Sequence, residues 1–94
     1  MITHIIGSDT RLLFEWIDSA DLPMPISAAT FTVKDRDDNT VTISSSLTYE
    51  DGAVRIHIQD TDTTSAANYA YTVTATSGTD KQIISAGLLR IKAP

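Results

Sequence analysis

The chain has 94 residues, no cysteine and a formal net charge of −5 at pH 7. This length predicts one domain, residues 1–94, and the lack of cysteine excludes disulfides, thiolate metal ligands and a cysteine nucleophile. The seven basic residues are scattered, so no basic stripe exists to contact phosphates or an anionic membrane. We therefore expect neither a nucleic acid nor a membrane as partner.

The N-terminal sequence Met1-Ile2-Thr3-His4 contains no basic run and no long apolar run. It predicts no secretory signal peptide, and the whole sequence predicts no transmembrane segment. The lack of cysteine fits assembly in a reducing cytoplasm.

The first third of the chain alternates apolar and polar residues between turn signals, a pattern typical of strands with one buried face. Strands are expected at residues 2–6, 10–17 and 28–35. In the second of these, Leu12, Phe14 and Trp16 share one face. The segment 18–25 is expected to be a loop, because its two prolines remove ladder donors.

The middle of the chain predicts a polar turn at 35–39, a strand at 40–45 and a hairpin with arms at 47–50 and 53–59. Asp51-Gly52 joins the two arms. This dipeptide predicts a type I′ turn, which needs positive φ at both central positions. Residues 60–67 are small and polar and allow one helical turn.

The last third predicts strands at 68–76 and 81–92, joined by a turn at 77–80. Tyr69, Tyr71, Val73 and Ala75 are expected to point inward from the first of these strands. In the second, the alternation slips around Ala86-Gly87, which predicts a β-bulge.

A chain made of seven or eight such strands, without a convincing helix, predicts an all-β fold, an Ig-like antiparallel two-sheet sandwich. The alternation also predicts which residues form its core. These are Phe14, Trp16, Phe31, Val33, Ile43, Val54, Ile56, Ile58, Tyr71, Val73 and Leu89.

Few residues could carry chemistry. The acidic turn of Asp35, Asp37, Asp38 and Asn39 offers oxygen ligands suited to calcium, but it lacks the glycine and late glutamate of a calcium loop. We therefore expect these side chains to cap backbone groups. His4 and His57 are expected at outward positions and are too few for a zinc site, which needs three or four ligands. Neither lies in a recognisable strand-to-helix elbow, so the sequence gives a hydrolase triad little support. No catalytic residue, metal ligand or cofactor site is predicted, and the protein is expected not to be an enzyme.

Two other features concern structure and contact. Tyr69, at the start of its strand, is a candidate for a tyrosine corner. Leu13 and Ile17 lie on the face of their strand opposite Trp16, so they form a candidate partner surface. The alternative is that a loop or the terminal strand covers them.

Three stretches resemble a recurring Ig-like module of tailed-phage virion proteins, found at the start of baseplate upper proteins and in small prophage structural proteins. They are Ile6 to Thr10 with Leu12-Leu13-Phe14; Ile26 to Asp35 with Asp38-Asn39-Thr40; and Asp60-Thr61-Asp62 with Asn68-Tyr69-Ala70-Tyr71 and Ser85 to Ile91. The module usually has glycine where this chain has Asn68, a residue that can also adopt the left-handed conformation.

The resemblance implies a non-enzymatic structural protein of a phage or prophage particle, in the tail, baseplate or head–tail region. Its partners would be other virion proteins or itself, and it would reside in the virion or in the bacterial cytoplasm during assembly. The alternative is a small β-sandwich module that recognises carbohydrate or a host surface through its loops.

Overall fold

The computed structural model describes residues 1–61 and 64–94, and these residues form eight strands and no helix. The strands are β1 (Ile2–Ile5), β2 (Thr10–Glu15), β3 (Ala28–Lys34), β4 (Thr40–Val41), β5 (Ser45–Glu50), β6 (Ala53–Ile58), β7 (Ala67–Ser77) and β8 (Asp80–Lys92). The helical turn allowed within residues 60–67 falls partly on residues 62 and 63, which lie outside the described residues.

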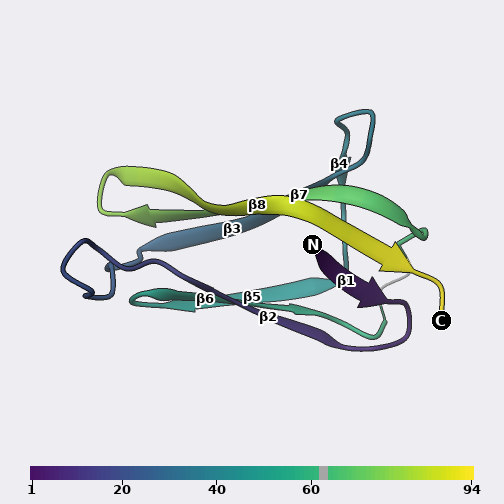
Figure 1. The fold of residues 1–94 in the computed structure, drawn as a ribbon, viewed down its shortest axis with the longest axis horizontal. Helices are drawn as coiled ribbons and strands as arrows, with labels where there is room; N and C mark the ends of the chain where they lie inside the picture. Colours follow the sequence, from purple (N-terminus) through teal and green to yellow (C-terminus); the bar gives the residue numbers. More distant parts are fainter. Residues whose placement is uncertain (62–63) are drawn as a thin grey trace.

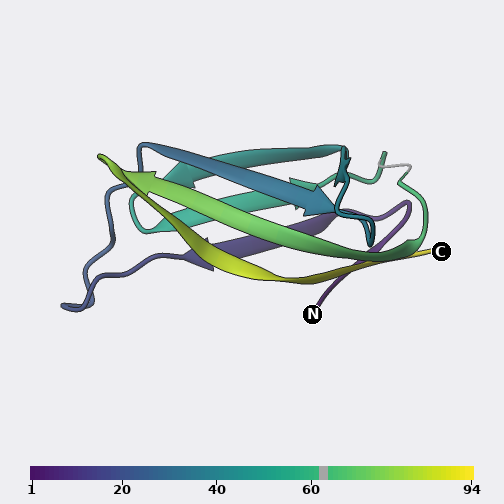
Figure 2. The same ribbon diagram turned by 90° about the horizontal axis from the view of Figure 1, so that it is seen from above.

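The strands form two sheets that lie face to face (Figures 1 and 2). The large sheet has the order β1-β8-β7-β3-β4, and the small sheet has the order β2-β6-β5. Every pairing is antiparallel except that of β1 with β8, which is parallel. The predicted two-sheet Ig-like sandwich is therefore confirmed, with one parallel pair at the edge of the large sheet.

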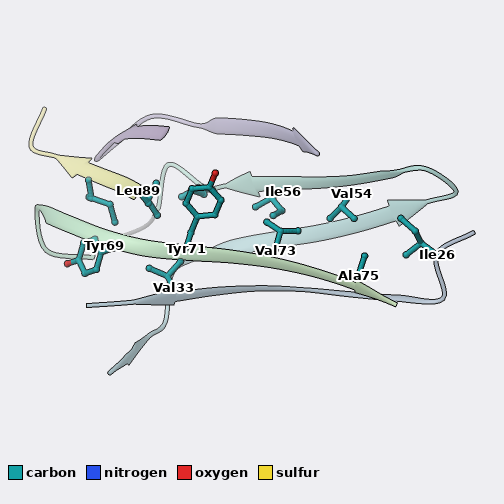
Figure 3. Close-up of a cluster of buried hydrophobic side chains, with 11 residues drawn as sticks. Ile26, Val33, Val54, Ile56, Tyr69, Tyr71, Val73, Ala75 and Leu89 are labelled. Atoms are coloured by element: carbon teal, nitrogen blue, oxygen red, sulfur yellow. The ribbon is translucent and has the colours of Figure 1, made fainter. Parts of the chain in front are cut away.

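The core lies between the sheets, where the inward faces of both contribute (Figure 3). Seven of the predicted core residues are buried, namely Val33, Val54, Ile56, Ile58, Tyr71, Val73 and Leu89. Phe14, Trp16, Phe31 and Ile43 are half-buried and pack against this cluster. Tyr69 and Ala75 are buried as the alternation of β7 predicted, and Ile26 and Ile91 complete the core.

The hairpin between β5 and β6 is confirmed, with Glu50 opposite Ala53. Its turn is not type I′, because Gly52 has a φ of +79° while Asp51 has no positive φ. Positive φ at the second central position alone is the pattern of a type II turn. This turn packs closely on the preceding loop, since a Cβ at Gly52 would lie 2.4 Å from the Cβ of Pro23.

The bulge in β8 lies earlier than the sequence predicted. Val73 pairs with Ser85 and Thr74 with Ile83, so Ile84 is the extra residue. Gly87 serves a different purpose, because a Cβ there would lie 3.3 Å from the ring of Tyr71. The glycine therefore makes room for this buried ring.

His4 is the clearest departure from the predicted positions. It is fully buried instead of outward, because β1 joins β8 with His4 in register with the buried Ile91. Its Nδ1 lies 2.8 Å from the Oγ1 of Thr10. This contact ties the first strand of the large sheet to the first strand of the small sheet.

Two predictions concern the start of β7. The tyrosine corner is confirmed, because the hydroxyl of Tyr69 donates a 2.6 Å hydrogen bond to the carbonyl of Ser65. The left-handed conformation considered for Asn68 is not adopted, because Asn68 lies within β7 and has no positive φ.

Candidate interaction surface on the small sheet

Leu13, in β2, and Ile17, two residues beyond the end of β2, are exposed on the side of the small sheet that faces away from the large sheet. The exposed fraction is 53% for Leu13 and 47% for Ile17. Neither a loop nor the terminal strand covers them, at least among residues 1–61 and 64–94. Because β2 pairs only with β6, it is also an edge strand of the small sheet.

The register of the small sheet places its outward side chains in rows across the three strands. Leu13 lies opposite Arg55, which lies opposite Thr48; the neighbouring rows are Arg11, His57 and Ser46 on one side and Glu15, Ala53 and Glu50 on the other. We call these nine residues, together with Ile17, the outer face of the small sheet. Leu13 is thus an apolar side chain flanked along its own strand by Arg11 and Glu15.

Two open depressions cross this outer face. The larger has a volume of about 380 Å³ and lies between Leu13, Thr48 and His57. The smaller has a volume of about 210 Å³ and lies between Leu13, Ile17 and the turn at Asp51-Gly52. Leu13 and Arg55 line both, so they form the ridge between the two depressions.

Charged groups on this face are only partly paired. Arg55 forms an exposed salt bridge with Glu50, and Nε2 of His57 lies 2.8 Å from Oδ1 of Asp9. The hydrogen bond from His57 lowers the pKa of the Asp9 carboxyl from its ordinary value of 3.8. Arg11 and Glu15 form no salt bridge with any residue of the described part. Arg11 also helps to lower the pKa of the Asp9 carboxyl through its charge, but without a salt bridge, so both Arg11 and Glu15 can pair with a partner.

Asp9, His57 and Ser46 are the residue types of a hydrolytic triad, and the fold brings them near one another. Ser46 lies opposite His57 in the register of β5 and β6. However, the described hydrogen bonds of His57 join it to Asp9 and none joins it to Ser46. The hydroxyl therefore lacks the adjacent base that activates a nucleophile. The arrangement supports a structural role for the His57–Asp9 pair, which fastens the turn before β2 to the end of β6.

The acidic turn at residues 35–39 caps its own backbone. Oδ1 of Asp35 accepts hydrogen bonds from the amides of Asp37 and Asn39, at 2.9 and 3.0 Å. Asp38 occupies the left-handed position, with a φ of +64°. Within the described residues, no group of three or more histidine, aspartate or glutamate side chains is placed to hold a metal ion.

The loop after β2 repeats the same turn, which the residue pattern of this loop did not lead us to predict. Oδ1 of Asp18 accepts hydrogen bonds from the amides of Ala20 and Leu22, at 2.8 and 3.0 Å. Asp21 has a φ of +61°, and Ile17 forms a bridge with Pro23. The turn therefore holds Ile17 in an extended conformation in line with Leu13. The signal in the sequence is an aspartate followed by another aspartate three positions later, which both turns share.

Comparison with solved structures identifies the class of fold. The chain superposes on a variant of titin with three immunoglobulin domains and glutamate-to-alanine mutations, with a TM-score of 0.51 and 14% sequence identity. The match covers 99% of this chain and 29% of the titin chain. No protein-family model and no curated protein sequence matches the chain. The fold is thus an Ig-like β-sandwich, and the likeness concerns the fold alone.

The part of the chain that the structure describes contains no helix long and apolar enough to cross a membrane.

Proposed function

We propose that this chain is a non-enzymatic structural module that binds other proteins through the outer face of the small sheet. The observation that carries the proposal is the exposure of Leu13 and Ile17 beside the open edge of β2. Full burial of a leucine or isoleucine side chain is worth about 1.5–3 kcal/mol, so covering both would favour association. An edge strand adds unpaired backbone groups that a partner can bond.

We further propose that the module belongs to a phage or prophage particle, in the tail, baseplate or head–tail region. The support for this setting is the sequence resemblance to Ig-like virion modules. Partners would then be other virion proteins or further copies of the chain. The acidic net charge of −5 would keep the free module in solution before incorporation.

Recognition of carbohydrate through loops has less support. Carbohydrate sites commonly stack sugars on exposed aromatic rings, and Tyr49 is the one aromatic among the exposed large hydrophobic residues in the described chain. Tyr49 lies in β5, and its hydroxyl donates a 2.9 Å hydrogen bond to the carbonyl of Ser27. This bond fastens β5 to the segment before β3, so the Tyr49 side chain has a structural role in the fold.

The test replaces Leu13 with Ser and Ile17 with Lys in one variant. Because both side chains are exposed, the variant should fold, as checked by circular dichroism and thermal melting. It should lose association with the particle proteins that co-purify with the wild-type chain, or with itself by light scattering.

The matched control replaces Ile83 with Ser and Leu88 with Lys on the outer face of the large sheet. These residues are exposed by 66% and 43%, comparable to the test pair. The control should associate like the wild type. A folded Leu13/Ile17 variant that assembles normally would show that the outer face of the small sheet is not the binding surface. Catalytic turnover of a small molecule by a chain that associates with no protein would contradict the proposed function as a whole.

A further inference from the structure

We infer that the partner of β2 is the β2 strand of a second copy, paired antiparallel about a two-fold axis at Leu13, so that the small sheets of two chains become one continuous sheet. This inference rests on the proposed function, because it names the partner of the same surface. It commits to one register, which the residues of β2 specify.

The free edge of β2 exposes the backbone groups of alternate residues. Glu15 and Ala53 are the last pair of β2 and β6, so the next residues, Trp16 and Gly52, lie opposite each other. The amide of Trp16 donates a 2.9 Å hydrogen bond to the carbonyl of Gly52. In an antiparallel pair, bonded and non-bonded positions alternate, so residues of even number on β2 direct their backbone groups to β6. Arg11, Leu13 and Glu15 therefore direct their N–H and C=O groups toward the open edge.

Antiparallel pairing requires that opposite residues lie on the same face of the sheet. With Leu13 opposite Leu13 of the second copy, Arg11 of each chain lies opposite Glu15 of the other. Leu13 thus lies against Leu13 of the second copy at the two-fold axis, and a pair of opposite charges, Arg11 and Glu15, flanks it on each side. Each of these three pairs would exchange two backbone hydrogen bonds. A self-complementary pattern of this kind is what a two-fold interface needs.

The other sheet edges are shorter or lack a self-complementary pattern. At the edges of the large sheet, β4 has two residues and β1 has four. The remaining edge strand, β5, also has six residues, but its outward side chains are Ser46, Thr48 and Glu50, which offer neither an apolar residue nor an opposite charge pair. Strand β2 offers six regular residues without proline, lysine or a bulge, the devices that commonly block edge pairing, and it places Leu13 between two opposite charges. The contact from His4 reaches it only at Thr10.

Charge exchange tests this register directly. The Arg11→Glu variant would place a new glutamate opposite Glu15 of the second copy, and the Glu15→Arg variant would place two arginines opposite each other. Each single variant should dimerise at least about tenfold more weakly than the wild type, measured by sedimentation velocity, because two attractive cross-strand pairs become repulsive. The double variant R11E/E15R restores both opposite pairs and should dimerise like the wild type.

Mixing the two single variants gives the sharpest result. One chain then has two acidic residues at these positions and the other has two basic residues, so a mixed dimer is complementary on both sides of Leu13. We expect the mixture to dimerise although neither variant does so alone. A mixture that stays monomeric while the wild type dimerises would overturn the proposed register.

A backbone variant separates this inference from the proposed function. Glu15→Pro removes an N–H directed at the open edge and leaves Leu13 and Ile17 in place, so the chain should keep its melting midpoint within a few degrees and lose the dimer. If the wild type is monomeric at millimolar concentration and the Leu13/Ile17 variant still loses its particle partners, self-pairing fails while the proposed function stands. If neither self-association nor particle binding responds to any of these changes, both fail.

Discussion

At the scale of single residues, Gly52 is constrained both by its backbone conformation and by its close contact with Pro23. Its amide donates to the carbonyl of Met24 at 2.8 Å, and its carbonyl accepts from Trp16 at 2.9 Å. A side chain there meets two penalties, namely the φ of +79° and the backbone and ring of Pro23. The glycine thus joins the β5–β6 turn to the loop that holds Ile17.

Gly78 provides a matched control, since its φ is +61° and a Cβ there would meet nothing within 4 Å. We expect Gly78→Ala to lower the free energy of unfolding by about 1–2 kcal/mol, the strain of a left-handed alanine. Gly52→Ala should cost about 1–3 kcal/mol more, because Pro23 must move. Urea unfolding of both variants measures the difference in their free energies of unfolding. Equal decreases in the two variants would show that Pro23 can move away from the new side chain without a cost in stability.

The pair of His57 and Asp9 predicts a dependence of stability on pH. The hydrogen bond from His57 lowers the folded-state pKa of Asp9 below 3.8, so its contribution is present above that pH. The contribution is lost as the pH falls through the lowered pKa. We therefore expect Asp9→Asn to be less stable than the wild type near neutral pH, with the difference narrowing below pH 3.8.

Thermal melts of the wild type and of Asp9→Asn across the acidic range provide the measurement, with Asp80→Asn, an exposed carboxyl on β8, as the control. A difference between the wild type and Asp9→Asn that persists unchanged at low pH would show that the carboxylate charge does not stabilise this corner.

At the scale of elements, the same turn appears twice, at residues 18–22 and 35–39. In each, an aspartate at the first position accepts two amides and an aspartate at the fourth has positive φ. Aspartate suits both places, because its short side chain bonds nearby amides and tolerates the left-handed region. Asp21 and Asp38 thus both adopt the left-handed conformation that glycine favours.

Because Oδ1 of Asp35 is already bonded to two amides, we expect the acidic turn to be a capping device and not a calcium site. Asp35→Ala should lower the free energy of unfolding by about 1–2 kcal/mol through the two lost bonds. Millimolar calcium or a chelator should leave the melting midpoint of the wild type unchanged. A midpoint that rises clearly with calcium would establish binding to the native state and contradict this interpretation.

The positions of the strands show which features of the fold could be predicted from the sequence. Alternation located all the strands within a few residues, because period two survives wherever one face is buried. It could not locate the bulge, because Ile83 and Ile84 are both apolar and Ser85 and Ala86 are both small, so the residue pattern does not mark where the phase changes. It also placed His4 on the wrong face, since a strand of four residues carries little periodicity and its direction depends on the parallel partner β8.

At the scale of the whole molecule, the sequence predicted the sandwich but not how its strands divide between the sheets. That division makes β2 an edge strand, because β1 joins β8 instead of β2. The alternation of apolar and polar residues was enough to predict that Leu13 and Ile17 point outward. The structure adds that no other part of the described chain covers them. The role that we propose for Arg11 and Glu15 could not be predicted from the sequence, because it depends on β2 being an edge strand. Their equal spacing on either side of Leu13 matters only when a second strand pairs with that edge.

Amide hydrogen exchange tests most directly the claim that β2 is the contact strand. In the free chain, the amides of Leu12 and Phe14 should be protected by β6, while those of Arg11, Leu13 and Glu15 exchange rapidly. At concentrations where the protein associates, these three amides should become protected as well, and the R11E variant at equal concentration should return them to rapid exchange. Rapid exchange of Arg11, Leu13 and Glu15 in the fully associated wild type would contradict the account.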